Sequence, residues 1–351
     1  MISEPQIDIF VQAAADLAYA LTLYERKHKA NAIRFLVSTS TDLYEHILAL
    51  RLPGAEVLFI PNFLLPFPRY PWTLIRKRFQ FERLYRRIYT RRFVQEAYFF
   101  CPLWDEITAA IAVRVARRAP VFLIDHYRLA TTRDFRWSVQ DMLHWLVYRI
   151  TTGQSFYLWK QPDRIGVVSF VGLDYEKFGI ASLALEVERQ VVSKYKVRPR
   201  VETRPAVLLF EGAEADSAEF VDYVPTITRL ISKLQDRGYA VYVKPHPRLG
   251  FSTFLESLRV RFLQAAIPAE FVDFSPFEAV IGVTSLALSA ASRYGAGKVI
   301  SLIDVIRFSD TGRVPGWKKH LADHGGERIM YPNSIAEVTA ILDGVLEVSG
   351  R

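Results

Sequence analysis

The stretch Tyr242-Val-Lys-Pro-His-Pro-Arg248 ends a short apolar run that begins at Ala240. Proline disfavours the helical region for the residue before it, so Lys244 and His246 are expected to be extended and stiffly held. In an α/β protein, ligands bind at the carboxyl ends of the strands. Lys244, His246 and Arg248 place three hydrogen-bond donors at such an end, and this set favours an oxyanion such as a phosphate.

The rest of the chain alternates short apolar runs with helical patterns, which indicates parallel sheets covered by helices. The predicted fold class is therefore α/β, with two Rossmann-like domains facing a central cleft. We expect an N-terminal domain over residues 1–170, a connection over 171–205 and a C-terminal domain over 206–351. The expected strands are Ile7–Val11, Ile33–Val37, Glu56–Ile60, Ala97–Cys101, Pro120–Ile124, Phe156–Trp159, Ile165–Phe170, Ala206–Phe210, Ala240–Val243 and Lys298–Ile303, with a short one near Val280. In the C-terminal domain, helices are expected from about Ala218 to Asp236, from Phe251 and from Ser285.

The composition is that of a globular protein. The chain has 351 residues, half of them apolar, which is enough for two ordinary domains and argues against disorder. Cys101 is the only cysteine, which excludes a disulfide framework and a cysteine-based metal site and favours a reducing compartment. The first residues carry no signal-like block, and charges interrupt the apolar runs before membrane-spanning length. We therefore predict a cytoplasmic protein.

The net charge is +8, and nine arginine and lysine residues lie between Arg69 and Arg92, interleaved with aromatic and aliphatic residues. This pattern predicts a basic amphipathic helix. One interpretation is contact with an anionic membrane surface or an anionic acceptor. The other is a helix packed on a sheet, with its arginine face in solvent. Nucleic acid is not expected as a partner, because no recognised nucleic-acid module accompanies the charge.

A second candidate phosphate site is Gly282-Val-Thr-Ser285, where a helix is expected to begin directly after a short apolar strand. Hydroxyl residues are good N-caps, so one interpretation is a capped helix. In the other, backbone N–H groups at the helix start and the hydroxyls of Thr284 and Ser285 bind a phosphate. Gly282 would let the ligand approach the backbone. The position downstream of the Lys-Pro-His-Pro segment favours the phosphate.

Three acidic positions have two interpretations each. Glu270 could accept hydrogen bonds from ribose hydroxyls, or it is an ordinary acid at a helix start. Asp125 and His126 end an apolar strand and could act as a general base on an acceptor hydroxyl. Alternatively, Asp125 caps the following turn and His126 lies at the surface. Glu211 and Gly212 begin a loop that could face the cleft, or Glu211 is a helix-start acid.

Together these residues resemble the bacterial sialyltransferases, a group that includes lipooligosaccharide sialyltransferases and capsule polysialyltransferases. The group shares a His-Pro motif, a paired-hydroxyl motif and an acidic-acidic-Gly motif. His246-Pro247 is similar to the first motif, and Thr284-Ser285 is similar to the second, with Thr before Ser instead of Ser-Ser or Ser-Thr. Ile267–Glu270 resembles the segment that contacts the nucleotide. The likeness is best from about residue 206 to 303 and is looser in the first domain.

The acidic-acidic-Gly motif departs from the pattern. Its counterpart Asp125-His126-Tyr127 has histidine for the second acid and tyrosine for the glycine. Glu211-Gly212 competes as a counterpart, with Phe210 where the first acid would stand. The identity of the base therefore stays open between these two segments.

The resemblance implies an inverting transfer from CMP-sialic acid, or a CMP-activated relative of it, to a surface glycan. It also implies the two-domain GT-B fold, with no cofactor and no metal ion. His246 would donate a proton to the departing phosphate, and Asp125 or His126 would deprotonate the acceptor. The expected partners are the CMP-sugar, the glycan acceptor and, through Arg69–Arg92, the inner face of the cytoplasmic membrane. The implied nucleotide-binding residues are Lys244, Arg248, Glu270, Gly282, Thr284 and Ser285.

Three other hypotheses stay open. A transferase of Kdo or of a polyol phosphate could use a similar strand end and helix start. The altered acidic motif could mark a nucleotide-sugar or glycan-binding homologue that has lost its base. A membrane-surface scaffold driven by Arg69–Arg92 would bind lipid even without His246.

Overall fold

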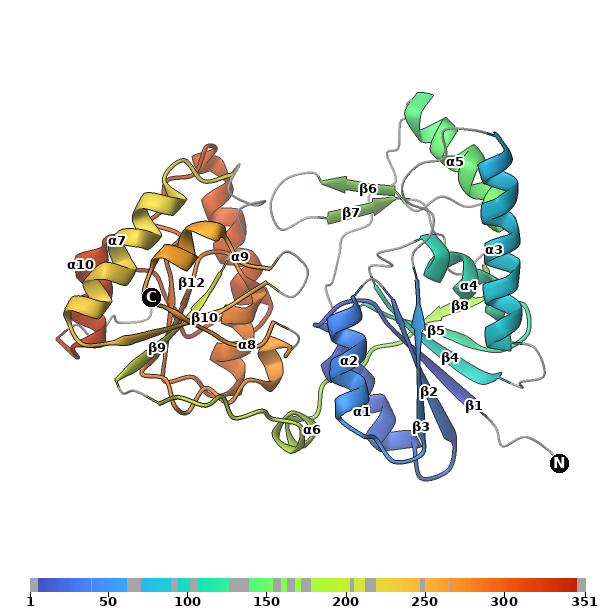
Figure 1. Cartoon of the computed structure of the whole chain (residues 1–351), viewed down its shortest axis with the longest axis horizontal. Coiled ribbons are helices and arrows are strands. Elements are labelled where there is room, and N and C mark those ends of the chain that lie inside the picture. Colours follow the sequence, from blue (N-terminus) through green and yellow to red (C-terminus); the bar gives the residue numbers. More distant parts are fainter. Residues whose placement is uncertain are drawn as a thin grey trace. The chain divides into compact units, whose positions relative to one another are not determined.

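The computed structural model of the protein describes residues 6–38, 40–61, 71–89, 94–101, 106–125, 139–153, 159–162, 168–171, 178–202, 205–211, 219–246, 250–265 and 267–345. The chain forms two compact units, Met1–Val191 and Val192–Arg351 (Figure 1). The boundary between them lies inside the stretch 171–205, where the sequence predicts a connection. Helix α6, Arg189–Lys194, crosses this boundary.

The first unit is built on a six-stranded parallel sheet in the order β3-β2-β1-β4-β5-β8. Two further strands, β6 (Trp159–Pro162) and β7 (Val168–Val171), pair with each other in antiparallel fashion. The strands of the sheet are β1 Gln6–Val11, β2 Ala32–Ser38, β3 Ala55–Ile60, β4 Val94–Cys101, β5 Val121–Asp125 and β8 Ile180–Ser182. The helices are α1 Asp16–Lys27, α2 Thr41–Ala49, α3 Pro71–Tyr89, α4 Glu106–Ala116 and α5 Val139–Thr152.

The second unit repeats this plan with the sheet order β11-β10-β9-β12-β13-β14, again entirely parallel. Its strands are β9 Ala206–Phe210, β10 Ala240–Lys244, β11 Arg261–Phe262, β12 Ala279–Gly282, β13 Lys298–Ser301 and β14 Ile329–Met330. Its α-helices are α7 Tyr223–Asp236, α8 Leu286–Tyr294, α9 Val314–Asp323 and α10 Ile335–Leu342, and its 3₁₀ turns are η3 Thr253–Ser257, η4 Ala269–Phe271 and η5 Thr311–Arg313.

If the six strands of each sheet are numbered from one to six in chain order, both sheets have the strand order 3-2-1-4-5-6. This is the order of a Rossmann fold. The predicted α/β class with two Rossmann-like domains is therefore confirmed. In such sheets, ligands bind beyond the carboxyl ends of the strands at the point where the order reverses. That point lies between β1 and β4 in the first unit, and between β9 and β12 in the second.

The core of the second unit explains why its strands are continuous apolar runs. All five residues of β9 are buried, because helices cover both faces of a parallel sheet. Helix α7 buries residues spaced three and four apart, the spacing of one helical face. These are Ile227, Leu230, Ile231 and Leu234, and they share one core with Leu209 and Ile281.

The structure differs from the sequence prediction at several element ends. Strand β8 completes the first sheet, although its residues lie in the predicted connection and only Ile180 in it is buried. Helix α7 begins at Tyr223, whereas the sequence predicts a start near Ala218. The helix expected from Phe251 is only the 3₁₀ turn η3. Strand β11 was not predicted, because both of its residues are exposed and form no apolar pattern.

A buried ion pair fixes the last turn of α3 to the centre of the first sheet. Asp8 and Arg34 are opposite each other on β1 and β2, and both are fully buried. Nε and Nη2 of Arg34 donate to the two carboxylate oxygens of Asp8 at 2.9 and 2.7 Å. Nη1 of Arg34 donates to the carbonyl oxygen of Ile88 at 2.8 Å, and the guanidinium lies 5.4 Å from the centre of the Tyr89 ring.

Candidate functional site

The carboxyl edge of the second sheet gathers most of the predicted site residues. Lys244 is the last residue of β10, Glu211 directly follows β9, and Gly282 ends β12. Because β9 pairs with both β10 and β12 in parallel, these three residues lie along one edge, at the point where the strand order reverses. The backbone N–H of Glu211 donates to the carbonyl oxygen of Lys244 at 3.3 Å, which ties the two strand ends together.

Glu211 holds the segment that follows β10. Its side chain is 3% exposed and accepts hydrogen bonds from the backbone N–H of Ser252, at 3.0 Å, and from the Ser252 hydroxyl. The sequence leaves Glu211 open between a loop residue that could face the cleft and an acid at a helix start, and the structure adds that its buried side chain holds Ser252. Its partner lies 41 residues further along the chain, with no sequence signal to mark it.

His246 is paired with Gly250 through two backbone hydrogen bonds. Its backbone N–H donates to the carbonyl oxygen of Gly250 at 2.8 Å, and the N–H of Gly250 donates back at 2.9 Å. Gly250 has a φ of 75°, a conformation that glycine adopts without strain. The imidazole is half-buried, at the sheet edge where the sequence predicted it. Three other predicted site residues, Arg248, Gly212 and His126, lie outside the described residues.

Lys244 is more deeply buried than the sequence suggested, with 4% of its surface exposed. Its Nζ donates to the carbonyl oxygens of Ala265 at 2.8 Å and Pro245 at 3.2 Å. Burial lowers the pKa of Lys244 to about 8, and the negative charge of Glu270 opposes that shift. The ammonium group therefore lies at the edge with two of its three donors engaged by carbonyls and with a carboxylate nearby.

Helix α8 begins one residue later than the sequence suggested, with Ser285 as its N-cap. The Ser285 hydroxyl oxygen accepts from the backbone N–H of Ala287 at 3.2 Å, so its own O–H is not used by this bond. Thr284, half-buried, directly precedes the cap. The two interpretations of this segment are therefore compatible, because a capping serine can still donate its proton to a ligand.

Gly282, the last residue of β12, packs against helix α8. A Cβ atom added at this position would lie 3.3 Å from Cγ and Cδ2 of Leu288 on α8. The absent side chain therefore makes room for Leu288, which is fully buried. Close packing of a helix onto the preceding strand requires this residue to be small.

Glu270 lies in the 3₁₀ turn η4, which packs against α8. Its side chain is half-buried, and its negative charge acts to raise the pKa of Lys244 against the larger effect of burial. The turn is held by Phe271, which is 1% exposed. Glu270 thus joins the edge formed by Lys244 and α8, close to where the sequence placed it.

The remaining predicted base belongs to the first unit. Asp125 is the last residue of β5, and its backbone is in register with Cys101 of β4. At the reversal point of the same sheet, sequence reasoning overlooked Asp16. Its buried carboxylate accepts from the backbone N–H groups of Gln12 and Ala13, both at 2.8 Å, and closes the turn after β1. The sequence signal for Asp16 is its place as an acid at the start of an apolar helix.

No group of three or more His, Cys, Asp or Glu side chains among the described residues is placed to hold a metal ion. Of the helices within those residues, none combines the length and the apolar character needed to cross a bilayer.

Comparison with known proteins points to the second unit. The family model for alpha-2,8-polysialyltransferase (POLYST) matches residues 202–303. That segment includes His246, Glu270, Thr284 and Ser285, and it nearly coincides with the stretch 206–303 that carries the sequence resemblance. The family match supports the predicted class of enzyme, a glycosyltransferase. No curated protein matches the sequence.

Solved structures match over nearly the whole chain at low sequence identity. E. coli ADP-heptose lps heptosyltransferase II is 14% identical, with a TM-score of 0.42 over 97% of this chain and 99% of that chain. E. coli heptosyltransferase WaaC is 10% identical, with a TM-score of 0.46 over 97% and 100%. The UDP-GlcNAc 2-epimerase from Methanocaldococcus jannaschii is 11% identical, with a TM-score of 0.48 over 99% and 94%.

Proposed function

We propose that the protein transfers sialic acid, or a related nonulosonic acid, from a CMP-sugar to a cell-surface glycan, with inversion at the anomeric carbon. One observation carries the proposal: the segment matched by the polysialyltransferase family contains the sheet edge on which Lys244, His246 and the start of α8 lie. The edge has the donors that an oxyanion needs, and it lies where Rossmann-like sheets bind their ligands.

In the proposed reaction, the acceptor hydroxyl oxygen forms a bond to the anomeric carbon of the donor sugar. The bond from that carbon to the CMP phosphate breaks, and its electron pair leaves with the phosphate oxygen. The base, Asp125 or His126, takes the acceptor proton, and His246 donates a proton to the departing phosphate. The N-terminus of α8, with the hydroxyls of Thr284 and Ser285, would stabilise the developing negative charge without a metal ion.

A second candidate function is binding of a nucleotide sugar without transfer. The altered acidic motif, Asp125-His126-Tyr127, favours it, because a homologue that only binds the nucleotide sugar does not need the base. CMP binding without any turnover of CMP-sialic acid would support this second candidate. The proposed location for either function is cytoplasmic and peripheral to the membrane, where an anionic surface would face the basic residues of α3.

Replacing His246 with alanine is expected to weaken CMP binding by at least about 1.5 kcal/mol, the scale of one charge-assisted hydrogen bond. Isothermal titration calorimetry of CMP into the wild type and His246→Ala measures this loss. Arg259→Ala is the matched control, because it also removes a side chain with N–H donors from this unit. Arg259 precedes β11 and therefore lies at the amino ends of the strands, away from the candidate site. No CMP binding by the wild type, even at high ligand concentration, would exclude a CMP-sugar donor.

CMP binding is also expected to depend on pH through Lys244. Its pKa is lowered to about 8, and a phosphate beside the ammonium would raise it, so binding at pH 8 should take up about half a proton. The affinity should then fall as the pH rises above 8, by up to about tenfold per pH unit. Calorimetry at pH 8 in buffers that differ in ionisation enthalpy measures this uptake.

The control for this experiment is Lys298, whose Nζ also donates to two carbonyl oxygens, those of Ile341 at 2.7 Å and Leu342 at 3.0 Å. Lys298 begins β13 and therefore lies at the opposite edge of the sheet. Lys244→Gln should abolish the proton uptake, and Lys298→Gln should leave it unchanged. Equal binding enthalpies for the wild type in all buffers would mean that the phosphate does not lie against Lys244.

A further inference from the structure

One surface of the first unit exposes an unusual number of large apolar side chains. Helix α3 exposes Trp72 (65%), Ile75 (58%) and Phe79 (71%). Helix α5 exposes three more, Leu143, Leu146 and Ile150. These six residues, which we call the α3–α5 surface, are half of the twelve large apolar side chains exposed in the described part of the chain. Apolar patches of this kind mark interaction sites.

On each helix the exposed apolar residues form one stripe. Trp72, Ile75 and Phe79 are spaced three and four residues apart, and Leu143, Leu146 and Ile150 repeat that spacing, so each set lies on a single helical face. The two helices pack against each other, as Figure 1 shows. The stripes therefore lie on two neighbouring helices of the first unit.

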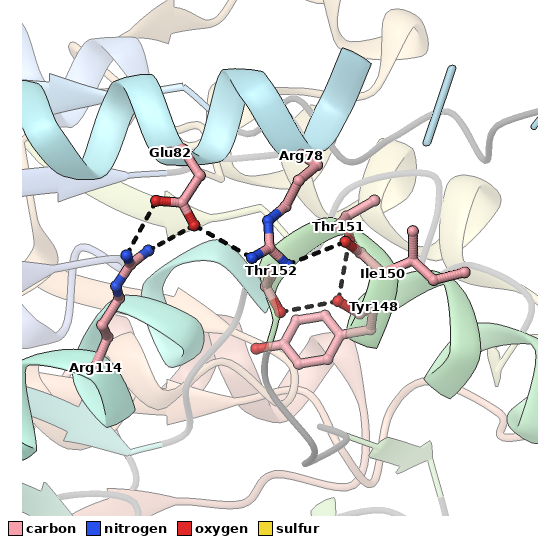
Figure 2. Close-up of polar contacts among 7 residues, drawn as sticks. All are labelled: Arg78, Glu82, Arg114, Tyr148, Ile150, Thr151 and Thr152. Atoms are coloured by element: carbon pink, nitrogen blue, oxygen red, sulfur yellow. Dashed lines mark hydrogen bonds and ion pairs between the residues drawn. The ribbon is translucent and has the colours of Figure 1, made fainter. Parts of the chain in front are cut away.

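A polar network holds the two helices in place (Figure 2). Nη1 of Arg78 donates to the carbonyl oxygen of Ile150 at 3.3 Å, which joins α3 to the end of α5. Arg78 also pairs with Glu82 at 3.5 Å, and Glu82 accepts two hydrogen bonds from Arg114 of α4 at 2.9 and 3.0 Å. Gly153 follows α5 with a φ of 73°, and a Cβ atom there would meet the Arg78 guanidinium at 2.6 Å.

The same face of α3 continues as a row of cations. Arg83 and Arg86 extend the stripe of Phe79 along the helix, and Arg76 and Arg87 flank it; all four are exposed. Arg76, Arg83 and Arg87 form no hydrogen bond or ion pair with any residue that the structure describes. The single acid of α3, Glu82, does not neutralise them, because Arg114 and Arg78 engage it and the Arg114 hydrogen bonds lower its pKa.

We infer that the α3–α5 surface docks on an anionic lipid bilayer. Its aromatic and aliphatic side chains would enter the boundary between headgroups and acyl chains, while the arginines bind lipid phosphates. This inference rests on the proposed membrane location and is independent of the donor. The basic segment Arg69–Arg92 of the sequence indicated contact with an anionic membrane. The structure adds helix α5, the exposed apolar side chains and the helical face that would meet the bilayer.

Charge and polarity favour a bilayer over other occupants. A second copy of the chain docking through the same surface would bring the two rows of arginines together, and like charges at an interface are unfavourable. An anionic glycan would match the arginines but would leave Trp72, Ile75 and Phe79 in water. A bilayer with anionic lipids offers an apolar region to the exposed aromatic and aliphatic side chains and phosphates to the arginines.

The test is co-sedimentation of the full chain with vesicles of phosphatidylcholine alone or mixed with phosphatidylglycerol. We expect binding only to the mixed vesicles. Phe79→Ser with Leu146→Ser should weaken that binding about tenfold or more, and Arg83→Glu with Arg87→Glu should weaken it at least as much. Leu48→Ser with Arg189→Glu is the matched control, since both residues are exposed elsewhere in the first unit, and it should bind as the wild type does.

CMP calorimetry on the same variants separates this inference from the proposed donor, because none of the four substituted positions lies in the unit that carries the nucleotide edge. Equal binding to neutral and mixed vesicles, or no vesicle binding by the wild type, would overturn the inference. So would variants that bind vesicles normally but lose self-association in light scattering, which would assign the surface to a second copy. Loss of binding only to a soluble anionic polysaccharide would instead assign it to the acceptor.

Discussion

Replacing Arg34 with methionine is expected to lower the free energy of unfolding of the first unit by about 3–5 kcal/mol. The substitution leaves the fully buried carboxylate of Asp8 without the two hydrogen bonds that it accepts at 2.9 and 2.7 Å. It also removes the donor to the Ile88 carbonyl, so the last turn of α3 loses its link to the sheet. Urea denaturation followed by circular dichroism measures the loss.

The matched variant changes both partners, Arg34→Met with Asp8→Leu. Well-packed apolar residues often replace a buried ion pair at little cost, so this double variant should recover most of the lost stability. The recovery separates an unpaired buried charge from a simple packing defect. A loss below about 1 kcal/mol for Arg34→Met alone would contradict the prediction, because it would place the pair in a solvated environment.

Replacing Glu211 with alanine is expected to lower the free energy of unfolding of the second unit by about 2–4 kcal/mol. The change removes a buried carboxylate that accepts from both the backbone N–H and the hydroxyl of Ser252. Two hydrogen bonds to a charged group contribute about 3–6 kcal/mol, and the variant no longer has the desolvation cost of the buried charge, which offsets part of this loss. Ser252→Ala keeps the backbone bond and should cost roughly half as much. Ser257→Ala, at an exposed serine, should change stability by less than about 0.5 kcal/mol.

Glu211→Gln distinguishes a structural clamp from a catalytic base. The amide oxygen of glutamine can still accept a hydrogen bond from the Ser252 N–H, and the amide group can form one with the Ser252 hydroxyl. We therefore expect folding, CMP binding and transfer to persist. A base would behave differently, since glutamine cannot take a proton and the turnover number would fall by about 10²–10⁴-fold with the fold intact. Transfer assays on Glu211→Gln beside Asp125→Asn therefore decide between the two segments that compete for this role.

Much of the fold could be predicted because a parallel sheet has a local signature. Strands buried on both faces are uninterrupted apolar runs, and those of Ala206–Phe210 and Val121–Asp125 were found within a residue or two. β11 and β8 were missed for the opposite reason. Both residues of β11 are exposed, and only Ile180 of β8 is buried, so neither strand has an apolar pattern. They are strands because they pair with a neighbouring strand, and the local sequence does not show that pairing.

The candidate site was predictable in position but not in detail. Strand ends and helix starts are local features, so Lys244, His246 and Ser285 were found at the edge where ligands bind. The burial of Glu211 depends on Ser252, and the space at Gly282 depends on Leu288 packing back onto the strand. Such contacts are set by tertiary structure. From the sequence alone, a glycine that leaves room for a ligand before a helix cannot be distinguished from one that leaves room for a leucine side chain.

The separate cores of the two sheets have a consequence for cooperativity. Each core is assembled from the strands and helices of its own unit, without apolar residues borrowed from the other cluster. A substitution beside one core is therefore expected to act first on the stability of its own unit, because two-state unfolding is a property of single domains of this size. Denaturation curves of Arg34→Met and Glu211→Ala then measure how far each loss stays within the unit that carries the substitution.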